Sequence, residues 1–370
     1  MKLKIDSDWN VTGKKRHNTP RWRALSLIYL VSVLFSILSS VQAATLPADL
    51  RSVLTDTFKF TNKDLEDVES GRPVAKFVSG NNPGDLRLVG IVLIETSSER
   101  AIEAYKDIVH FETGKEVLHT GKFSNPPKES DLAGFRIPDF DKKEFLACHP
   151  GKCAYKLPAS VIEDLQQHIN WSAPDAEEQV NRKVRKLWIE YLNRYREQGN
   201  AALAVYYDTP EPFSVADGLR QIMNGLGSAH EKIPDLMLYL AEYPKGRPPN
   251  TEDFFYWQEA AFGLKPVVRT SHVIIQRIPG PGDSTYFIAS KMLFATHYFR
   301  AALELKWLDP VNSESGRPAV YFLTYQHSYV DGMNGLSGAF LRHIVPGRTR
   351  KSLIEKLRQA KEQLENGENK

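Results

Sequence analysis

Cysteine is scarce in this sequence: among 370 residues only Cys148 and Cys153 occur, both within the stretch LACHPGKCAYKLP. A c-type haem is excluded, because its attachment needs the spacing Cys-x-x-Cys-His. A structural zinc ion could use Cys148, His149 and Cys153, but it would need a fourth ligand, and the sequence has no second cysteine pair. We therefore expect neither a metal ion nor a cofactor.

Internal repeats and low-complexity tracts are also missing, as is any basic stripe interleaved with aromatic residues. The positive charge is concentrated at the N-terminus. The whole chain carries +3, and residues 1–43 contain seven Lys or Arg and two Asp, which leaves −2 for the remainder. The usual electrostatic footprint of a nucleic-acid-binding protein is therefore absent, and we expect no nucleic-acid partner.

Residues 24–41, ALSLIYLVSVLFSILSSV, contain no charged residue and follow Arg21 and Arg23. Val41-Gln42-Ala43 is a small-x-small pattern that a signal peptidase recognises. Two interpretations stay open: residues 1–43 are a signal peptide cleaved after Ala43, or residues 24–41 are an uncleaved N-terminal anchor. Both predict an exported protein, either periplasmic or held at the membrane by that anchor.

In an exported protein, two cysteines most simply form a disulfide. Pro150-Gly151 lies between Cys148 and Cys153 and is a suitable turn to bring them together. We therefore predict a structural Cys148–Cys153 disulfide that closes a small loop.

Three parts are expected after the leader. Residues 44–170 predict an N-terminal α+β lobe with the cysteine loop, including strands at 73–78 and 86–96 and a capped helix after Ser97-Ser98. Residues 174–263 predict a mainly helical segment, in which a long helix ends at Gly199 and 251–263 is also at least partly helical. Residues 264–366 predict an antiparallel β-meander followed by C-terminal helices.

The meander is the clearest pattern in the chain. Strands are predicted at 267–278, 284–295, 296–308 and 318–330, and their short connections require antiparallel pairing. In the third strand, residues from His297 to Trp307 alternate between an apolar face and a face with Arg300, Glu304 and Lys306, which predicts one buried and one wet side. Two helices separated by a break at Pro346-Gly347 follow. The predicted class is α+β, with an antiparallel β-meander packed on a long C-terminal helix.

The strand LVGIVLIET, the helix after it, the segments FSNPPKESDL and LACHPGKCAYKLP, and VNRK after NWSAPDAEEQ together resemble a family of uncharacterised exported bacterial proteins. The resemblance extends over most of the chain after the leader. It implies export and the cysteine spacing, but no activity.

The order of elements, with a curved meander at the back and a long terminal helix, also resembles the helix-grip (START-like) lipid-transfer architecture. Its usual plan does not contain the inserted helices of 174–263. The resemblance implies an apolar cavity between the sheet and the last helix. The residues that we expect to contact a hydrophobic or lipid-like ligand there are His297, Phe299, Tyr321, Tyr325 and Tyr329. His297, on an otherwise apolar strand face, is also typical of a hydrogen-bonded core histidine.

The stretch QHSYVDGMNG contains His-x-x-x-Asp-Gly, which resembles the active-site motif of CoA-dependent acyltransferases. That resemblance implies His327 as a general base and Asp331 as a structural partner. Gln326 occupies the place of the family's usual second histidine, and its Asp-Phe-Gly-Trp motif is missing. A strand that ends in a polar turn before a helix often contains these residues without any catalytic role.

Three functions stay open on the sequence alone. The leading one is non-catalytic binding of a hydrophobic small molecule or lipid by an exported protein. The alternatives are an acyltransferase-like or hydrolytic enzyme that uses His327, and a structural or partner-binding envelope protein. The basic C-terminal helix is either solvated or in contact with anionic lipid headgroups at a membrane surface.

Overall fold

The computed structural model describes residues 45–80, 82–226, 232–313, 316–333 and 335–366, without the side chains of 79 and 335–344. The chain divides into two compact units, residues 1–42 and 43–370, and all described residues belong to the second. The apolar segment 24–41, predicted to be a signal peptide or an anchor, lies outside the described residues.

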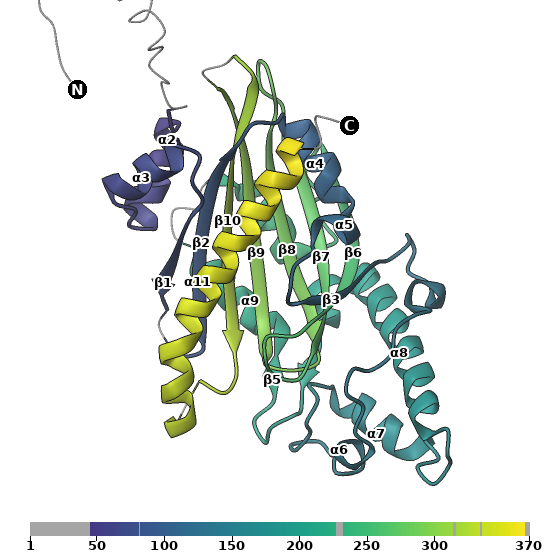
Figure 1. Ribbon diagram of the computed structural model, residues 1–370. Helices are drawn as coiled ribbons and strands as arrows, with labels where there is room; N and C mark the ends of the chain where they lie inside the picture. The colour runs from purple at the N-terminus through teal and green to yellow at the C-terminus, as the bar shows by residue number, and fades with distance from the viewer. Residues whose placement is uncertain (1–44, 81, 227–231, 314–315, 334, 367–370) are drawn as a thin grey trace, which may run out of the picture. The chain divides into compact units, whose positions relative to one another are not determined.

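Within the described residues, one eight-stranded sheet is the centre of the fold (Figure 1). The strand order is β1-β2-β10-β9-β8-β7-β6-β3, and every neighbouring pair is antiparallel. The strands are β1 (Val74–Ser79), β2 (Asp85–Ile94), β3 (Val117–Lys122), β6 (Thr251–Ala260), β7 (Val267–Ile278), β8 (Thr285–Ala295), β9 (Phe299–Asn312) and β10 (Pro318–Val330). The α+β class and the antiparallel meander are therefore confirmed.

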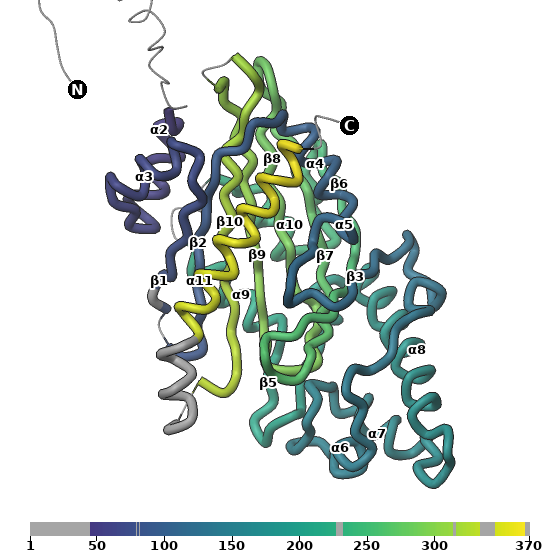
Figure 2. The backbone as a smooth tube through the Cα atoms, viewed as in Figure 1, coloured from purple at the N-terminus to yellow at the C-terminus, as the bar shows by residue number. Residues whose placement is uncertain are grey.

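The helices cover both faces of this sheet. They are α2 (Ala48–Ser52), α3 (Asn62–Glu69), α4 (Ser98–Lys106), α5 (Ile108–Phe111), α6 (Lys142–Leu146), α7 (Ala159–His168), α8 (Ala176–Gln198), α9 (Val215–Asn224), α10 (Pro234–Glu242) and α11 (Gly335–Asn366). Shorter helical turns occupy Val53–Thr57, Glu129–Leu132 and Gly199–Ala202, and β4 (Val205–Tyr206) pairs with β5 (Phe213–Ser214). The helices α4 and α11 share a core with one face of the sheet, whereas α8, α9 and α10 share a core with the other (Figures 1 and 2). We call these the α11 face and the α8–α10 face.

The long C-terminal helix packs directly on the sheet. Leu353 and Leu357 of α11 are buried against β2, where Gly90 leaves room for them. A Cβ at Gly90 would lie 2.8 Å from Leu357 Cδ1, which is closer than such atoms approach. At this crossing, the space in which the helix-grip resemblance places a ligand is filled by side chains.

The helix α11 is continuous from Gly335 to Asn366, with Pro346 inside it, so the predicted break at Pro346-Gly347 was wrong. Proline removes one backbone hydrogen bond, but it does not end a helix that tertiary packing stabilises. Thr349 Oγ1 donates to the carbonyl of Val345 at 2.8 Å, one turn earlier, across the proline.

The segment 251–263 was predicted to be at least partly helical, but residues 251–260 form β6, which pairs with β7 from Thr251↔Gln276 to Ala260↔Val267. Its aromatic run is buried on both faces, with Tyr256 on one side and Phe255 and Trp257 on the other, so the strand shows no alternation of polar and apolar residues. The sequence also missed β3, the edge strand beside β6. The three predicted parts after the leader therefore contribute to one sheet.

The face of β9 expected to be wet is partly buried. Lys306, whose side chain is 5% exposed, forms an ion pair with Glu304, which also accepts hydrogen bonds from Thr324 Oγ1 at 3.0 Å and Gln326 Nε2 at 2.8 Å. Burial opposes ionisation of Glu304, but attraction to Lys306 is stronger and lowers the pKa of the carboxyl to about 2. Glu304 and Lys306, which were predicted to face solvent, instead form a polar layer under the α11 face, whereas Arg300 is partly exposed and paired with Asp331.

Candidate functional site

The five residues predicted to hold a hydrophobic ligand do not form one site. Tyr321 and Tyr325 lie on the α8–α10 face of β10, opposite α11, and are buried in the core there. Their neighbours Val320 and Phe322 belong to the core that contains α11. Because successive strand residues point to opposite faces, Tyr321 and Tyr325 cannot line a cavity beneath the last helix.

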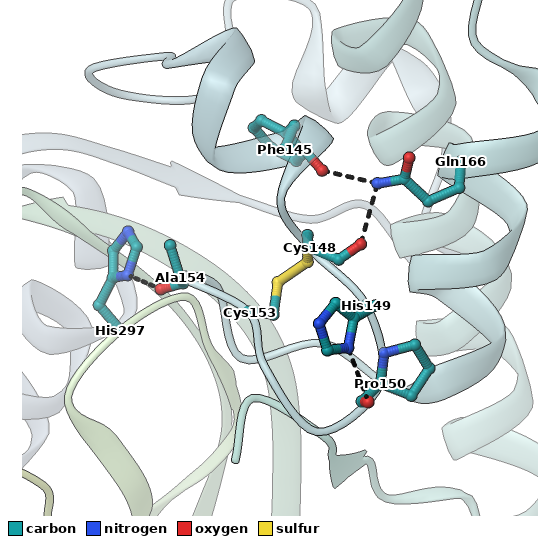
Figure 3. The surroundings of a disulfide bond; sticks show 8 residues. All are labelled: Phe145, Cys148, His149, Pro150, Cys153, Ala154, Gln166 and His297. Atoms are coloured by element: carbon teal, nitrogen blue, oxygen red, sulfur yellow. Dashed lines mark hydrogen bonds between the residues drawn. A yellow bond between two sulfur atoms is a disulfide. The ribbon is translucent and has the colours of Figure 1, made fainter. Parts of the chain in front are cut away.

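Phe299 and His297 have other surroundings. The Phe299 ring lies 6.2 Å from that of Phe262 and 5.5 Å from the Arg269 guanidinium. His297 is buried, and its Nδ1 donates to the Ala154 carbonyl at 3.0 Å (Figure 3). Burial lowers the pKa of His297. This is the arrangement of a core histidine that ties the meander to the cysteine loop.

The cysteine loop is a disulfide-closed hairpin, as predicted. Cys148 and Cys153 are bonded with their Cα atoms 4.3 Å apart, and Gly151 adopts a φ of 92° at the turn. Closing a loop of this length should stabilise the fold by about 2 kcal/mol. Both sulfurs are used in the bond, so neither is left to bind a metal ion as a thiolate.

Hydrogen bonds to its backbone hold this hairpin in place. Gln166 Nε2 of α7 donates to the carbonyls of Phe145 at 2.6 Å and Cys148 at 3.1 Å (Figure 3). On the other side, Gly151 N donates to the Tyr207 carbonyl at 2.7 Å. The loop therefore joins α7 to the segment after β4, which is a structural role.

His327 and Asp331 belong to different networks. His327 Nε2 donates to Asp85 Oδ1 at 2.7 Å, and Arg87 Nη2 donates to the other oxygen of Asp85 at 2.6 Å. Burial lowers the pKa of His327, and attraction to Asp85 partly offsets this effect. Asp331 instead forms ion pairs with Arg300 and Lys156. The two residues of the His-x-x-x-Asp-Gly stretch thus do not form one acid–base pair, and His327 is only 1% exposed.

The basic side chains of α11 make contacts within the protein. Arg350 Nε donates to the Ala75 carbonyl at 2.7 Å, and Lys361 Nζ to the Leu93 carbonyl at 2.7 Å. Lys356 lies 3.7 Å from Glu112, and Arg358 is paired with Glu355. These contacts give the basic residues of α11 a structural role. Contact of this helix with a membrane surface stays a prediction.

A pocket of about 250 Å³ opens on the α8–α10 face, at the ends of α8 and α10 and against β6. We call it the α8–α10 pocket. Four segments supply its lining, which consists of Phe123, Ser124, Asn125, Arg196, Tyr239, Tyr243, Pro244, Arg247, Asp253, Phe254 and Phe255. None of these residues was predicted from the sequence to be functional.

Gly199 brings two walls of the α8–α10 pocket together. It ends α8 with φ 62° and ψ −139°, a conformation that favours glycine. A Cβ at Gly199 would lie 1.6 Å from the Tyr243 carbonyl oxygen. Only a residue without a side chain allows the end of α8, with Arg196, to lie against the segment that follows α10.

The charged groups of the pocket are two arginines and one aspartate. Arg196 Nη2 donates to Asn125 Oδ1 at 2.8 Å, and Arg247 Nη2 to the Thr251 carbonyl at 2.8 Å. Asp253 accepts a hydrogen bond from the Tyr239 hydroxyl at 3.3 Å, and Arg247 Nη1 lies 3.8 Å from it. Burial would raise the pKa of Asp253, but contacts with His272 and Arg247 outweigh it and keep the pKa below its usual value.

Buried polar groups lie behind the wall formed by Asp253 and Tyr243. His272 Nε2 is 3.8 Å from Asp253 Oδ2, and His272 Nδ1 is 3.1 Å from the Tyr195 hydroxyl. Burial lowers the pKa of His272 to about 4, so the ring is neutral near pH 7. Among the described residues, His272 Nε2 has no hydrogen-bond partner.

Lys291 faces His272 across the β7–β8 pair and is 1% exposed. Its Nζ donates to Asn200 Oδ1 at 2.8 Å and lies 5.0 and 5.3 Å from the Tyr195 and Tyr243 ring centroids. No carboxylate within the described part of the chain is paired with it, and burial lowers the pKa of Lys291 to about 7. Perturbed groups of this kind collect at functional sites.

A second pocket, of about 360 Å³, lies between α9 and α10 and is more open. Met223, Met237 and Leu238 line it, and its charged residue Arg220 is paired with Asp217 at the helix surface. It lacks the convergent polar groups of the α8–α10 pocket.

Comparison with known proteins does not assign this protein to a family. A scan against protein-family models and a search of curated proteins both find no match. Among the helices that the structure describes, none combines the length and apolar character required to cross a bilayer.

Proposed function

We propose that this protein is an exported, non-catalytic binding protein that holds one small organic molecule in the α8–α10 pocket. The single observation that carries the proposal is the pocket itself, where aromatic walls surround a few convergent polar side chains.

The proposed site differs from the one expected beneath the last helix. A hydrophobic or lipid-like ligand was expected there, but Leu353 and Leu357 fill the crossing of α11 and β2. The volume of about 250 Å³ lies below the roughly 300–1,000 Å³ that ligand pockets commonly have, which favours a molecule smaller than a lipid.

Export is part of the proposal. The basic residues before the apolar segment 24–41 and the pattern that ends at Ala43 support it. A disulfide also suits an oxidising compartment such as the periplasm.

Mass spectrometry of the full-length protein, purified from its own host, tests this function. Under native conditions we expect a mass excess of one small molecule per chain, which disappears on denaturation. Replacing Arg196 by tryptophan should fill the pocket and abolish the excess, because this half-buried side chain lies on the pocket wall.

Arg194→Trp is the matched control, since Arg194 is exposed two positions earlier on α8 and does not line the pocket. It should keep the bound molecule. Protein that is uniformly free of ligand, or a mass excess that survives Arg196→Trp, would contradict the proposal.

A further inference from the structure

The charge at the α8–α10 pocket is unbalanced. Two guanidinium groups and one carboxylate line it, so these three side chains carry a net charge of +1. Arg196 contributes most clearly to the excess. Its hydrogen bonds go to the amide oxygens of Asn125 and Asn193, at 2.8 and 3.4 Å, and the described residues provide no carboxylate within ion-pair distance.

Asp253 is not available as the main recognition group. Its Oδ2 atom already accepts from the Tyr239 hydroxyl at 3.3 Å and has Arg247 Nη1 and His272 Nε2 each at 3.8 Å. A cationic ligand would therefore approach a carboxylate that already has Arg247 beside it. An anionic ligand would approach Arg196, whose charge is not offset.

The inner wall of the pocket is aromatic. The Tyr243 ring stacks on Tyr195 with centroids 4.9 Å apart, and Phe255 packs edge-on against Tyr195 at 6.0 Å. Burial in this cluster raises the pKa of Tyr243 to about 12, so its ring stays neutral. Flat, neutral rings and guanidinium groups in one pocket suit a molecule with one apolar end and one acidic end.

We infer that the ligand of the α8–α10 pocket is a small organic anion, with its acid group held between Arg196 and Arg247 and its apolar part on the Tyr243 and Phe255 rings. This inference rests on the proposed binding function and specifies its ligand class. Planar, forked guanidinium groups recognise carboxylates through paired hydrogen bonds, which explains why arginine suits this site.

Calorimetric titration of the full-length protein with three matched probes tests the ligand class. Benzoate, benzyl alcohol and benzylamine each carry one ring and one further carbon, and differ in charge. We expect benzoate to bind at least about tenfold more tightly than the other two, since a charge-assisted hydrogen bond is roughly twice as strong as a neutral one. Inorganic phosphate, which lacks an apolar end, should bind more weakly than benzoate.

Variants locate the acid group. Arg196→Gln and Arg247→Gln should each weaken benzoate binding about tenfold or more and leave the affinity for benzyl alcohol nearly unchanged. Arg196→Lys, which keeps the charge, should recover part of the affinity. Arg220→Gln removes an arginine at the second pocket and should bind benzoate like the wild type.

The outcomes separate the ligand class from the binding function. If benzyl alcohol and benzoate bind equally, and the arginine variants change neither affinity, the inference of an anionic ligand is overturned and a neutral ligand is indicated. Preference for benzylamine would overturn it in favour of recognition by Asp253. If no probe binds and the host-purified protein is also free of ligand, the proposed function itself fails.

Discussion

Replacing Lys291 by methionine should remove a rise of about 2 kcal/mol in the free energy of unfolding between pH 7 and pH 9. In the folded protein, burial lowers the pKa of Lys291 from its ordinary 10.5 to about 7. Above pH 7 the folded state releases this proton, whereas the unfolded chain keeps it until pH 10 or so. The unfolded state therefore binds more protons across this window, and stability must increase with pH.

The measurement is chemical denaturation of the full-length protein at several pH values in this window. Lys291→Met should give a flatter dependence than the wild type. Lys245→Met, which removes an exposed side chain next to Pro244 of the α8–α10 pocket, should keep the wild-type slope. Parallel curves for wild type and Lys291→Met would show that the Lys291 amine is not held in the buried, unpaired environment described here.

Gly199→Ala should destabilise the protein by about 3 kcal/mol or more and remove the α8–α10 pocket. The added Cβ would overlap the Tyr243 carbonyl oxygen, 1.6 Å away, so the end of α8 and the segment after α10 must separate. Arg196 lies on the first of these segments and Arg247 on the second, so their separation would take apart the lining of the pocket.

Gly246→Ala provides a control in the same region. Gly246 also has a positive φ, of 69°, but open space surrounds its Cβ position, so only the backbone strain of about 1–2 kcal/mol applies. Denaturation midpoints of the two variants give the comparison. An equal loss of stability would contradict the close packing of Gly199 on Tyr243.

The sequence predicted those elements whose pattern is long and regular. The helix α8 carries an apolar stripe from Val180 to Tyr195, and clear turn residues follow β7 and β9, so the type and order of these elements could be derived. The segment 251–260 could not, because a strand buried on both faces has no alternation. The pair Glu304 and Lys306 was predicted wrongly for a related reason. Charged residues on one face of a strand predict that this face is exposed to solvent, unless their partners within the protein are known.

The candidate site was not predictable from any motif. Its residues come from the loop after β3, from α8, from the end of α10 and from β6, and only the folded chain brings them together. One signal was present in the sequence. Lys291 is the single charged residue in the apolar strand STYFIASKMLFA. An isolated ionisable residue within a strand that is otherwise buried deserves consideration as part of a site.

The most direct measurement of the central claim is a crystal structure of the protein grown with 4-bromobenzoate, in which anomalous scattering locates the bromine. We predict one strong peak in the α8–α10 pocket, against Tyr243 and Phe255, with the carboxylate between Arg196 and Arg247. A peak confined to the space beneath α11 or to the groove between α9 and α10, or an empty α8–α10 pocket at a saturating concentration, would contradict the account.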